Sequence, residues 1–233
     1  MGRAKPTLPR NWTFADVRKH LGIPLYRIRS FPAPGTATER DLLAVLDHED
    51  RLCELIDGVL VEKTMGLKES MIASEINRRM GNFVMERGSG ILTVTDGFWR
   101  LLPGQVRAPD VAFISFDRLP NRKAPVEPIP DLVPDLAVEV ICAGNTWKEL
   151  KRKLKDYFVA GVRLVWFIDP DNRRGQIYTA PDEMRLVTED EAMDGGDVLP
   201  GFQLPLRELF ALLPDEPPTR RRPKRPRGTT NGR

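Results

Sequence analysis

Three acidic residues of this chain lie in apolar stretches that are typical of buried β-strands. Glu54 and Glu139 have apolar neighbours on both sides, and Asp110 follows Pro109 at the head of an apolar run. A carboxylate that is removed from water must be paired, protonated or bound to a cation. Hard divalent cations such as Mg²⁺ prefer carboxylate oxygens, so acids converging from neighbouring strands would form a metal site. Alternatively, each acid lies on a solvated strand face or pairs with an arginine.

Two predicted groups of strands would carry Glu54 and Asp110. The first is a hairpin, because Asp57-Gly58 between two apolar runs is typical of a two-residue β-turn. Its strands are Leu52 to Ile56 and Val59 to Lys63. The second is a meander of three apolar segments separated by glycine-containing turns, and Asp110 lies in the last segment. These segments are Ile91 to Val94, Phe98 to Leu102 and Val106 to Ser115.

A strand–helix–strand passage would carry Glu139. Leu136 to Cys142 and Leu164 to Ile168 are predicted to be buried strands, and a helical stripe from Trp147 to Phe158, closed by Gly161, joins them. This order favours a parallel crossover. The remaining elements are predicted from spacing and capping residues. They are helices at Thr13 to Leu21, Thr38 to Leu46, Leu67 to about Gly88 and Leu206 to Leu212, and edge strands at Gln176 to Thr179 and Met184 to Thr188.

The composition is that of a globular chain: 41% of the 233 residues are hydrophobic and 30% are charged. Two cysteines and two histidines cannot supply a paired zinc cluster or a disulfide framework. The longest apolar run, Leu164 to Ile168, is far shorter than the roughly 18 residues of a membrane helix. No apolar stretch follows the first basic residues, so no secretory signal is predicted. We expect a cytoplasmic protein that does not enter a membrane.

Charge and proline content predict three parts. Residues 1–35 form a basic N-terminal extension, with seven basic residues and one acid giving a net charge of +6. Residues 36–213 form the compact domain. Residues 214–233 form a Pro/Arg-rich tail that is expected to be disordered, and its last part, residues 219–233, holds seven basic residues and no acid, a net charge of +7. Because the whole chain carries +3, about −10 remains on the body between the two basic ends.

Six short features follow one another along the compact domain. They are Glu54-Leu-Ile-Asp-Gly, Ala108-Pro-Asp-Val-Ala-Phe, Pro134-Asp-Leu-Ala-Val-Glu-Val, the lysine-rich helix that runs to Tyr157, Ala160-Gly-Val and Val165-Trp-Phe-Ile-Asp-Pro. In this order and spacing, residues 36 to 212 resemble the Uma-type putative restriction endonuclease family, a branch of the PD-(D/E)XK phosphodiesterase superfamily. The resemblance implies an endonuclease-like α/β domain with a central mixed β-sheet flanked by helices.

The resemblance also implies roles for four residues. Asp110 and Glu139 would ligate a divalent metal, Mg²⁺ with Mn²⁺ as a substitute, and Glu54 would be a further ligand or orient a metal-bound water. The lysine that the wider superfamily places two residues after the second acid is replaced by Ile141. The family places its lysine on the following helix, where helical spacing alone leaves Lys151 and Lys153 open. The resemblance assigns the role to Lys153.

The function implied is that of a metal-dependent endonuclease that hydrolyses DNA, and relatives commonly form homodimers. The alternative is a catalytically idle relative that binds nucleic acid or a protein partner. In either case the basic tail would contact phosphates, or would be only a solvated terminus. The predicted nucleic-acid-binding residues of the tail are Arg220, Arg221, Arg222, Lys224, Arg225 and Arg227.

Overall fold

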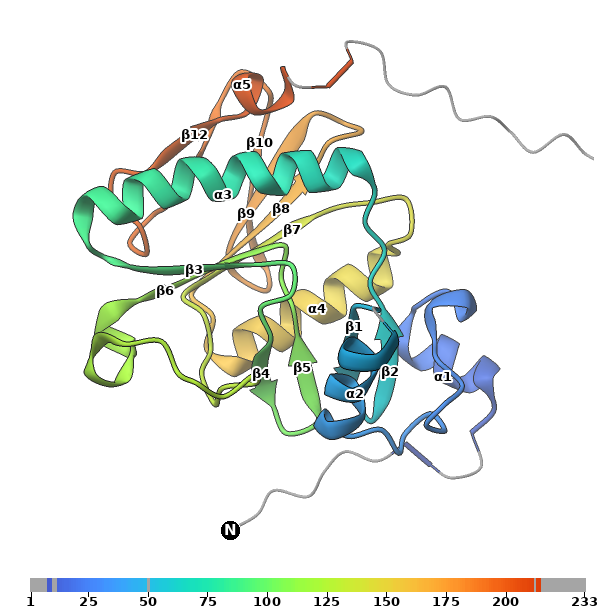
Figure 1. The fold of residues 1–233 in the computed structure, drawn as a ribbon. Helices are drawn as coiled ribbons and strands as arrows, with labels where there is room; N and C mark the ends of the chain where they lie inside the picture. The colour runs from blue at the N-terminus through green and yellow to red at the C-terminus, as the bar shows by residue number, and fades with distance from the viewer. Residues whose placement is uncertain (1–7, 10–11, 50, 212, 215–233) are drawn as a thin grey trace, which may run out of the picture.

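A six-stranded mixed sheet forms the centre of the computed structural model, which describes residues 8–9, 12–49, 51–211 and 213–214 (Figure 1). The strand order is β10-β9-β8-β7-β6-β3, in which β7 and β8 are parallel and every other neighbouring pair is antiparallel. The predicted mixed α/β class is therefore confirmed. The strands are β3 (Gly90–Val94), β6 (Val111–Ser115), β7 (Leu136–Val140), β8 (Leu164–Asp169), β9 (Arg174–Ala180) and β10 (Glu183–Val187).

Helices cover both faces of this sheet. Helix α3 (Leu67–Arg87) packs on the face that presents Val138 and Val140, and α4 (Trp147–Ala160) packs on the opposite face beside Ala137 (Figure 1). Successive residues of a strand point to opposite faces, so Glu139 shares the α4 face. Helix α4 connects the parallel strands β7 and β8, which confirms the predicted crossover.

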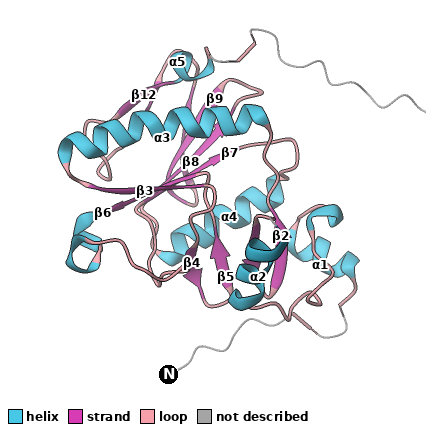
Figure 2. Cartoon of the chain, viewed as in Figure 1, coloured by secondary structure: helices cyan, strands magenta, loops and turns pink. Residues whose placement is uncertain are grey.

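A smaller antiparallel sheet lies beside the larger one, with the order β2-β1-β5-β4 (Figure 2). The predicted hairpin around Asp57 and Gly58 is confirmed, since β1 and β2 pair directly across these two residues. Asp57 and Gly58 both adopt positive φ angles, as a tight turn of this kind requires. The strands are β1 (Cys53–Ile56), β2 (Val59–Glu62), β4 (Trp99–Leu102) and β5 (Gln105–Arg107).

The predicted meander is wrong. Strand β3 pairs with β6 in the large sheet, whereas β4 and β5 pair with each other and join β1 in the small sheet. The run from Val106 to Ser115 is two strands, because Pro109 lacks the N–H that a continuous ladder needs. The chain therefore passes from one sheet to the other at Pro109, immediately before Asp110.

The segment before residue 36 contributes to the packed unit, which thus begins earlier than the predicted boundary. Helix α1 (Phe14–Leu21) buries Val17 and Leu21, which lie four residues apart on one helix face, and Ile23 follows them. They pack against Ile56, Val59 and Val61 of the hairpin. Residues 215–233, which hold nearly all of the predicted tail, lie outside the described residues.

The other elements surround this core. None of the helices in the described part of the chain has the length and apolar character needed to cross a bilayer. The helices are α2 (Glu39–Glu49), α5 (Leu206–Phe210) and the short 3₁₀ turns η1 (Leu25–Arg27), η2 (Phe116–Arg118) and η3 (Pro120–Arg122). The strands are β11 (Ala192–Asp194) and β12 (Gln203–Pro205), which pair with each other.

Candidate active site

Four residues that the sequence singled out lie together where the two sheets and α4 meet. Glu54 comes from β1, Asp110 immediately precedes β6, Glu139 comes from β7 and Lys153 from α4. Each is at most 5% exposed. Because Val111 pairs with Val138, Asp110 and Glu139 occupy the next step of the same antiparallel ladder. Ion pairs connect Lys153 to both glutamates.

Helix α4 supplies both polar partners of Glu139. The Nζ atom of Lys153 donates to Oε2 of Glu139 at 2.8 Å, and the Tyr157 hydroxyl donates to Oε1 at 2.5 Å. Lys153 and Tyr157 are four residues apart and share one helix face. The helix is fixed at its start by Thr146, whose side chain accepts from the backbone N–H of Glu149, and it ends at Gly161 with a positive φ. Both carboxylate oxygens of Glu139 are thus engaged.

Asp110 is held by the backbone of β7 and by a second lysine. The backbone N–H of Val140 donates to Oδ2 of Asp110 at 2.7 Å. The Nζ atom of Lys63, just after β2, donates to Oδ1 at 2.9 Å and also to the carbonyl oxygen of Ala108. The side chain of Lys63 is 7% exposed, so this ion pair is nearly excluded from solvent.

Glu54 is held by an arginine. Nη1 of Arg107 donates to Oε2 of Glu54 at 3.0 Å, while Lys153 and the backbone N–H of Ala108 lie 3.1 and 3.2 Å from Oε1. Arg107 in turn donates to Asp156 on α4 at 2.6 Å. The arginine pairing considered from the sequence therefore occurs at Glu54, and these contacts suit a residue that positions Lys153.

The electrostatics of the cluster differ from one carboxyl to the next. Burial raises the pKa of Glu139, and the nearby charge of Asp110 adds to that rise, although Lys153 opposes it. Burial also acts to raise the pKa of Glu54, but Lys153 and Arg107 outweigh it and hold this pKa below its usual value. Burial acts to lower the pKa of Lys153, yet Glu139 and Glu54 prevail and raise it. Lys153 therefore remains an ammonium at neutral pH.

The position of α4 separates Lys153 from the other lysines of the helix. Lys148, Lys151 and Lys155 are exposed, whereas Lys153 is 4% exposed and faces the acids. Of the two lysines that helical spacing left open, Lys153 is the buried one that contacts the acids, and its role in the site remains a prediction.

Sequence reasoning missed three residues of this cluster: Lys63, Arg107 and Tyr157. A signal for Lys63 was present, because the two-residue hairpin pairs Glu54 with Val61 and so places Lys63 on the same face as Glu54. Tyr157 follows Lys153 at the i+4 position, which indicates a shared face. Arg107 lies in an apolar run beside Asp110, and a buried arginine requires an acidic partner.

The donor chemistry of Asp110 and Glu139 fits a hard divalent cation. They are two carboxylates on neighbouring strands, and the pKa of Glu139 is raised in part by Asp110, a repulsion that a cation would relieve. Within the described residues, no group of three or more His, Cys, Asp or Glu side chains is arranged to hold a metal ion. The role of Glu54 as a third ligand remains a prediction.

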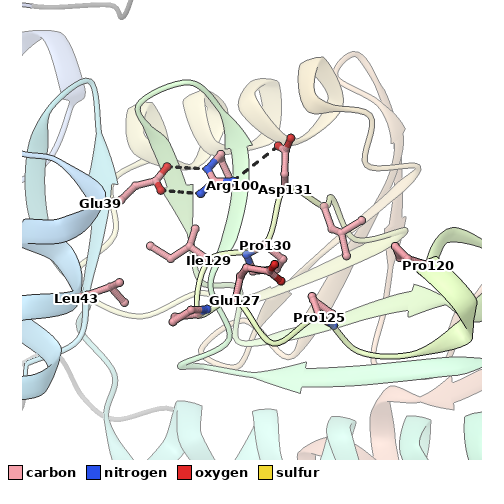
Figure 3. Close-up of a pocket in the computed structure, with 11 residues that line it drawn as sticks. Glu39, Leu43, Arg100, Pro120, Pro125, Glu127, Ile129, Pro130 and Asp131 are labelled. Atoms are coloured by element: carbon pink, nitrogen blue, oxygen red, sulfur yellow. Dashed lines mark hydrogen bonds and ion pairs between the residues drawn. The ribbon is translucent and has the colours of Figure 1, made fainter.

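Two surface cavities lie apart from this cluster. One of about 500 Å³ lies between α2 and the proline-rich loop, where Arg100 pairs with Glu39 at 2.7 Å and approaches Asp131 at 4.0 Å (Figure 3). Another, of about 560 Å³, is bordered by Arg18 and Lys148. None of the four predicted site residues lines either cavity. The basic tail residues predicted to bind nucleic acid lie outside the described residues.

Comparisons with known proteins agree with the fold and the motifs. The model of the Uma2 family, described as "Putative restriction endonuclease", matches residues 39–207. A crystal structure of a putative nuclease belonging to DUF820 from Anabaena variabilis is similar to the chain, with a TM-score of 0.62 and 19% sequence identity. The similarity covers 70% of this chain and 91% of that chain, and at this identity it shows the fold. No curated protein matches the chain.

Proposed function

Since this chain belongs to the Uma2 family of putative restriction endonucleases, we propose that it is a metal-dependent endonuclease that hydrolyses DNA. One observation carries the proposal: two buried carboxylates on neighbouring strands, Asp110 and Glu139, lie beside a buried lysine, Lys153. Burying two carboxylates close together costs free energy, and such an arrangement is typical of sites that bind a cation and a phosphate.

Asp110 and Glu139 would hold Mg²⁺, with Mn²⁺ as a substitute. When bound, such an ion acts as a Lewis acid that lowers the pKa of a coordinated water and stabilises negative charge on a phosphate. Glu54 keeps the two roles predicted for it, a further ligand or an orienting group. Its contacts with Arg107 and Lys153 would in addition let it position the ammonium of Lys153.

Lys153 provides a fixed positive charge in this site. Its ammonium contacts Glu139 at 2.8 Å and Glu54 at 3.1 Å, and Arg107 holds Glu54 in place from the other side. An ammonium cannot act as a general base, so Lys153 would position the attacking water or neutralise the charge that develops on the phosphate. Arg107 is a positioning residue, because it acts through Glu54.

The reaction would be hydrolysis of a phosphodiester by in-line attack. The oxygen of a water molecule forms a bond to phosphorus, and the bond from phosphorus to the leaving oxygen breaks with its electron pair. The attacking water loses one proton and the leaving oxygen gains one, so that one product ends in a phosphate and the other in a hydroxyl. Negative charge rises at the phosphate during this step, where Lys153 would stabilise it.

The charge distribution bears on how DNA would be held. A body of about −10 repels a polyanion at long range, so phosphate binding would depend on the basic ends of the chain and on the bound cation. The affinity for DNA should therefore fall steeply as the salt concentration rises.

The test is to incubate the purified chain with supercoiled plasmid and with single-stranded DNA in Mg²⁺, in Mn²⁺ and in EDTA. We expect nicked or linear plasmid with either cation and intact DNA in EDTA. The Glu139→Gln variant, which keeps the shape of the side chain, is the control for a contaminating nuclease. Binding of DNA without cleavage under all conditions would instead favour the catalytically idle relative.

A further inference from the structure

The oxygen atoms that surround the ammonium of Lys63 are of the kind that bind metal ions. Its Nζ atom donates to a carboxylate oxygen of Asp110 at 2.9 Å and to the backbone carbonyl oxygen of Ala108. Carboxylate and carbonyl oxygens are the donors that hard divalent cations take in proteins. The ammonium of Lys63 thus contacts oxygens that a metal ion would use.

The charges of the cluster show how the contact between Lys63 and Asp110 would affect metal binding. Glu54, Asp110 and Glu139 bring three negative charges when ionised, and Arg107, Lys153 and Lys63 bring three positive charges. Without a metal, these three basic residues offset the charges of the three acids, and Arg107 also pairs with Asp156. A divalent cation added to this set would meet the ammonium of Lys63 at Asp110, and two cations on one buried carboxylate repel each other strongly.

The three basic residues differ in what holds them. Arg107 is fixed between Glu54 and Asp156, and Lys153 between Glu54 and Glu139. Lys63 has one acidic partner and one carbonyl, it follows the last residue of β2, and its flexible side chain allows the ammonium to move without moving the backbone. Lys63 is therefore the cation of the cluster that is most easily displaced.

We propose that Lys63 is a built-in competitor of the metal: its ammonium holds Asp110 in the metal-free protein, and a divalent cation must displace it to bind. This inference rests on the proposed function, since it concerns the same metal site. It makes the affinity for the cation lower than the two carboxylates alone would give, and it keeps the buried acids neutralised while no metal is bound.

The experiment is a calorimetric titration of the intact chain with Ca²⁺ alone, without DNA. In Lys63→Met, which keeps the aliphatic side chain and removes the charge, the dissociation constant for Ca²⁺ should fall at least about tenfold. This follows because a neighbouring opposite charge shifts the protonation of a carboxylate by roughly one to three pKa units. The matched control is Lys68→Met, because Lys68 pairs with Asp171 outside the cluster and should leave the affinity unchanged.

If Lys63→Met is too unstable without metal for a titration, thermal unfolding of the same variants with and without Ca²⁺ replaces it. Ca²⁺ should then raise its melting temperature by more than it raises that of the parent. Equal or weaker Ca²⁺ binding by Lys63→Met, with no larger stabilisation, would overturn the inference. If the parent binds Ca²⁺ and Asp110→Asn does not, the proposed metal site stands whatever Lys63→Met shows. If neither the parent nor Lys63→Met binds Ca²⁺, both proposals fail.

Discussion

Helix α4 carries two buried ionic clusters that lie one turn apart. In its first turn, Glu149 accepts from Nη1 of Arg27 at 2.9 Å, and both side chains are 3% exposed. Arg27 also donates to the carbonyl oxygens of Glu62 and Gly144 at 2.8 and 3.1 Å. One acid meets one base, and the base also donates to two backbone carbonyl oxygens. This cluster joins the N-terminal segment to the start of α4.

The cluster around Lys153, one turn later, has a different composition. Several acids converge on it, and the pKa of Glu139 is raised by burial and by its neighbour Asp110 although two lysines lie close by. Both clusters bury charge, so burial alone does not distinguish them. The difference lies in complementarity: a structural ion pair is balanced pair by pair, whereas the cluster at Lys153 brings like charges together, as sites for metal ions and phosphates do.

The largest expected effect is a loss of activity when the acids of the cluster around Lys153 are replaced. Asp110→Ala and Glu139→Ala should each lower the rate of DNA cleavage in Mn²⁺ about a thousandfold or more, since the metal contributes several kcal/mol to transition-state stabilisation. Each variant takes an acidic partner from a buried lysine, Lys63 or Lys153, so the free energy of unfolding in EDTA should fall, and cleavage is compared per folded molecule at low temperature. The exposed Asp117→Ala is the control. Cleavage at the parental rate by either variant would show that the site is misplaced.

The second effect is a loss of stability when the ion pair of Arg27 and Glu149 is broken. Glu149→Gln leaves Arg27 buried without its partner, so the free energy of unfolding should fall by about 3 kcal/mol. The rate of cleavage per folded molecule should be unchanged. Urea denaturation together with an activity assay at low temperature measures both quantities. A large loss of turnover in the folded variant would show that the pair of Arg27 and Glu149 also contributes to catalysis.

A third effect separates Lys153 from the other lysines of the same helix. Lys153→Ala should lower turnover at saturating DNA about a hundredfold, as the loss of one group that stabilises transition-state charge typically does. Lys148→Ala and Lys155→Ala should change turnover little, because both residues are exposed and Lys148 donates to the carbonyl oxygen of Lys19. Similar losses in all three variants would indicate that the general positive charge of α4 matters instead.

The smallest effect concerns the basic C-terminal residues. If Arg220 to Arg227 contact phosphates, deletion from Pro217 onward should weaken DNA binding for all sequences alike and leave turnover at saturation intact. The slope of log affinity against log salt should flatten by about 0.9 for each lost contact. Binding measured across a salt series in Ca²⁺ tests this, and an unchanged slope would assign no phosphate contact to these residues.

Local patterns were enough to predict most of the elements and the acids. The hairpin at Asp57 and Gly58 and the crossover through α4 each depend on residues close in sequence, and an acid within an apolar run is visible without a structure. Burial of Glu54, Asp110 and Glu139 follows from such runs. These features could be predicted because turn chemistry and hydrophobic periodicity act over a few residues.

Long-range pairing was the part that the sequence did not reveal. The pairing of β3 with β6, rather than with β4, depends on which sheet buries which face, and neighbouring apolar runs gave no sign of it. For the same reason the contacts of Lys63 with Asp110 and of Arg107 with Glu54 escaped prediction, since each joins residues about fifty positions apart. Partners of buried charges are set by the tertiary fold rather than by spacing along the chain.

The most direct measurement of the central claim compares the two clusters by thermal unfolding with and without Mn²⁺. The account predicts that Mn²⁺ raises the melting temperature of the parent and does not raise that of Asp110→Asn. It also predicts that Glu149→Gln melts at a lower temperature but gains as much from Mn²⁺ as the parent does. An equal gain from Mn²⁺ in Asp110→Asn and in the parent, or no gain in the parent, would contradict the assignment of a cation to the cluster around Asp110 and Glu139.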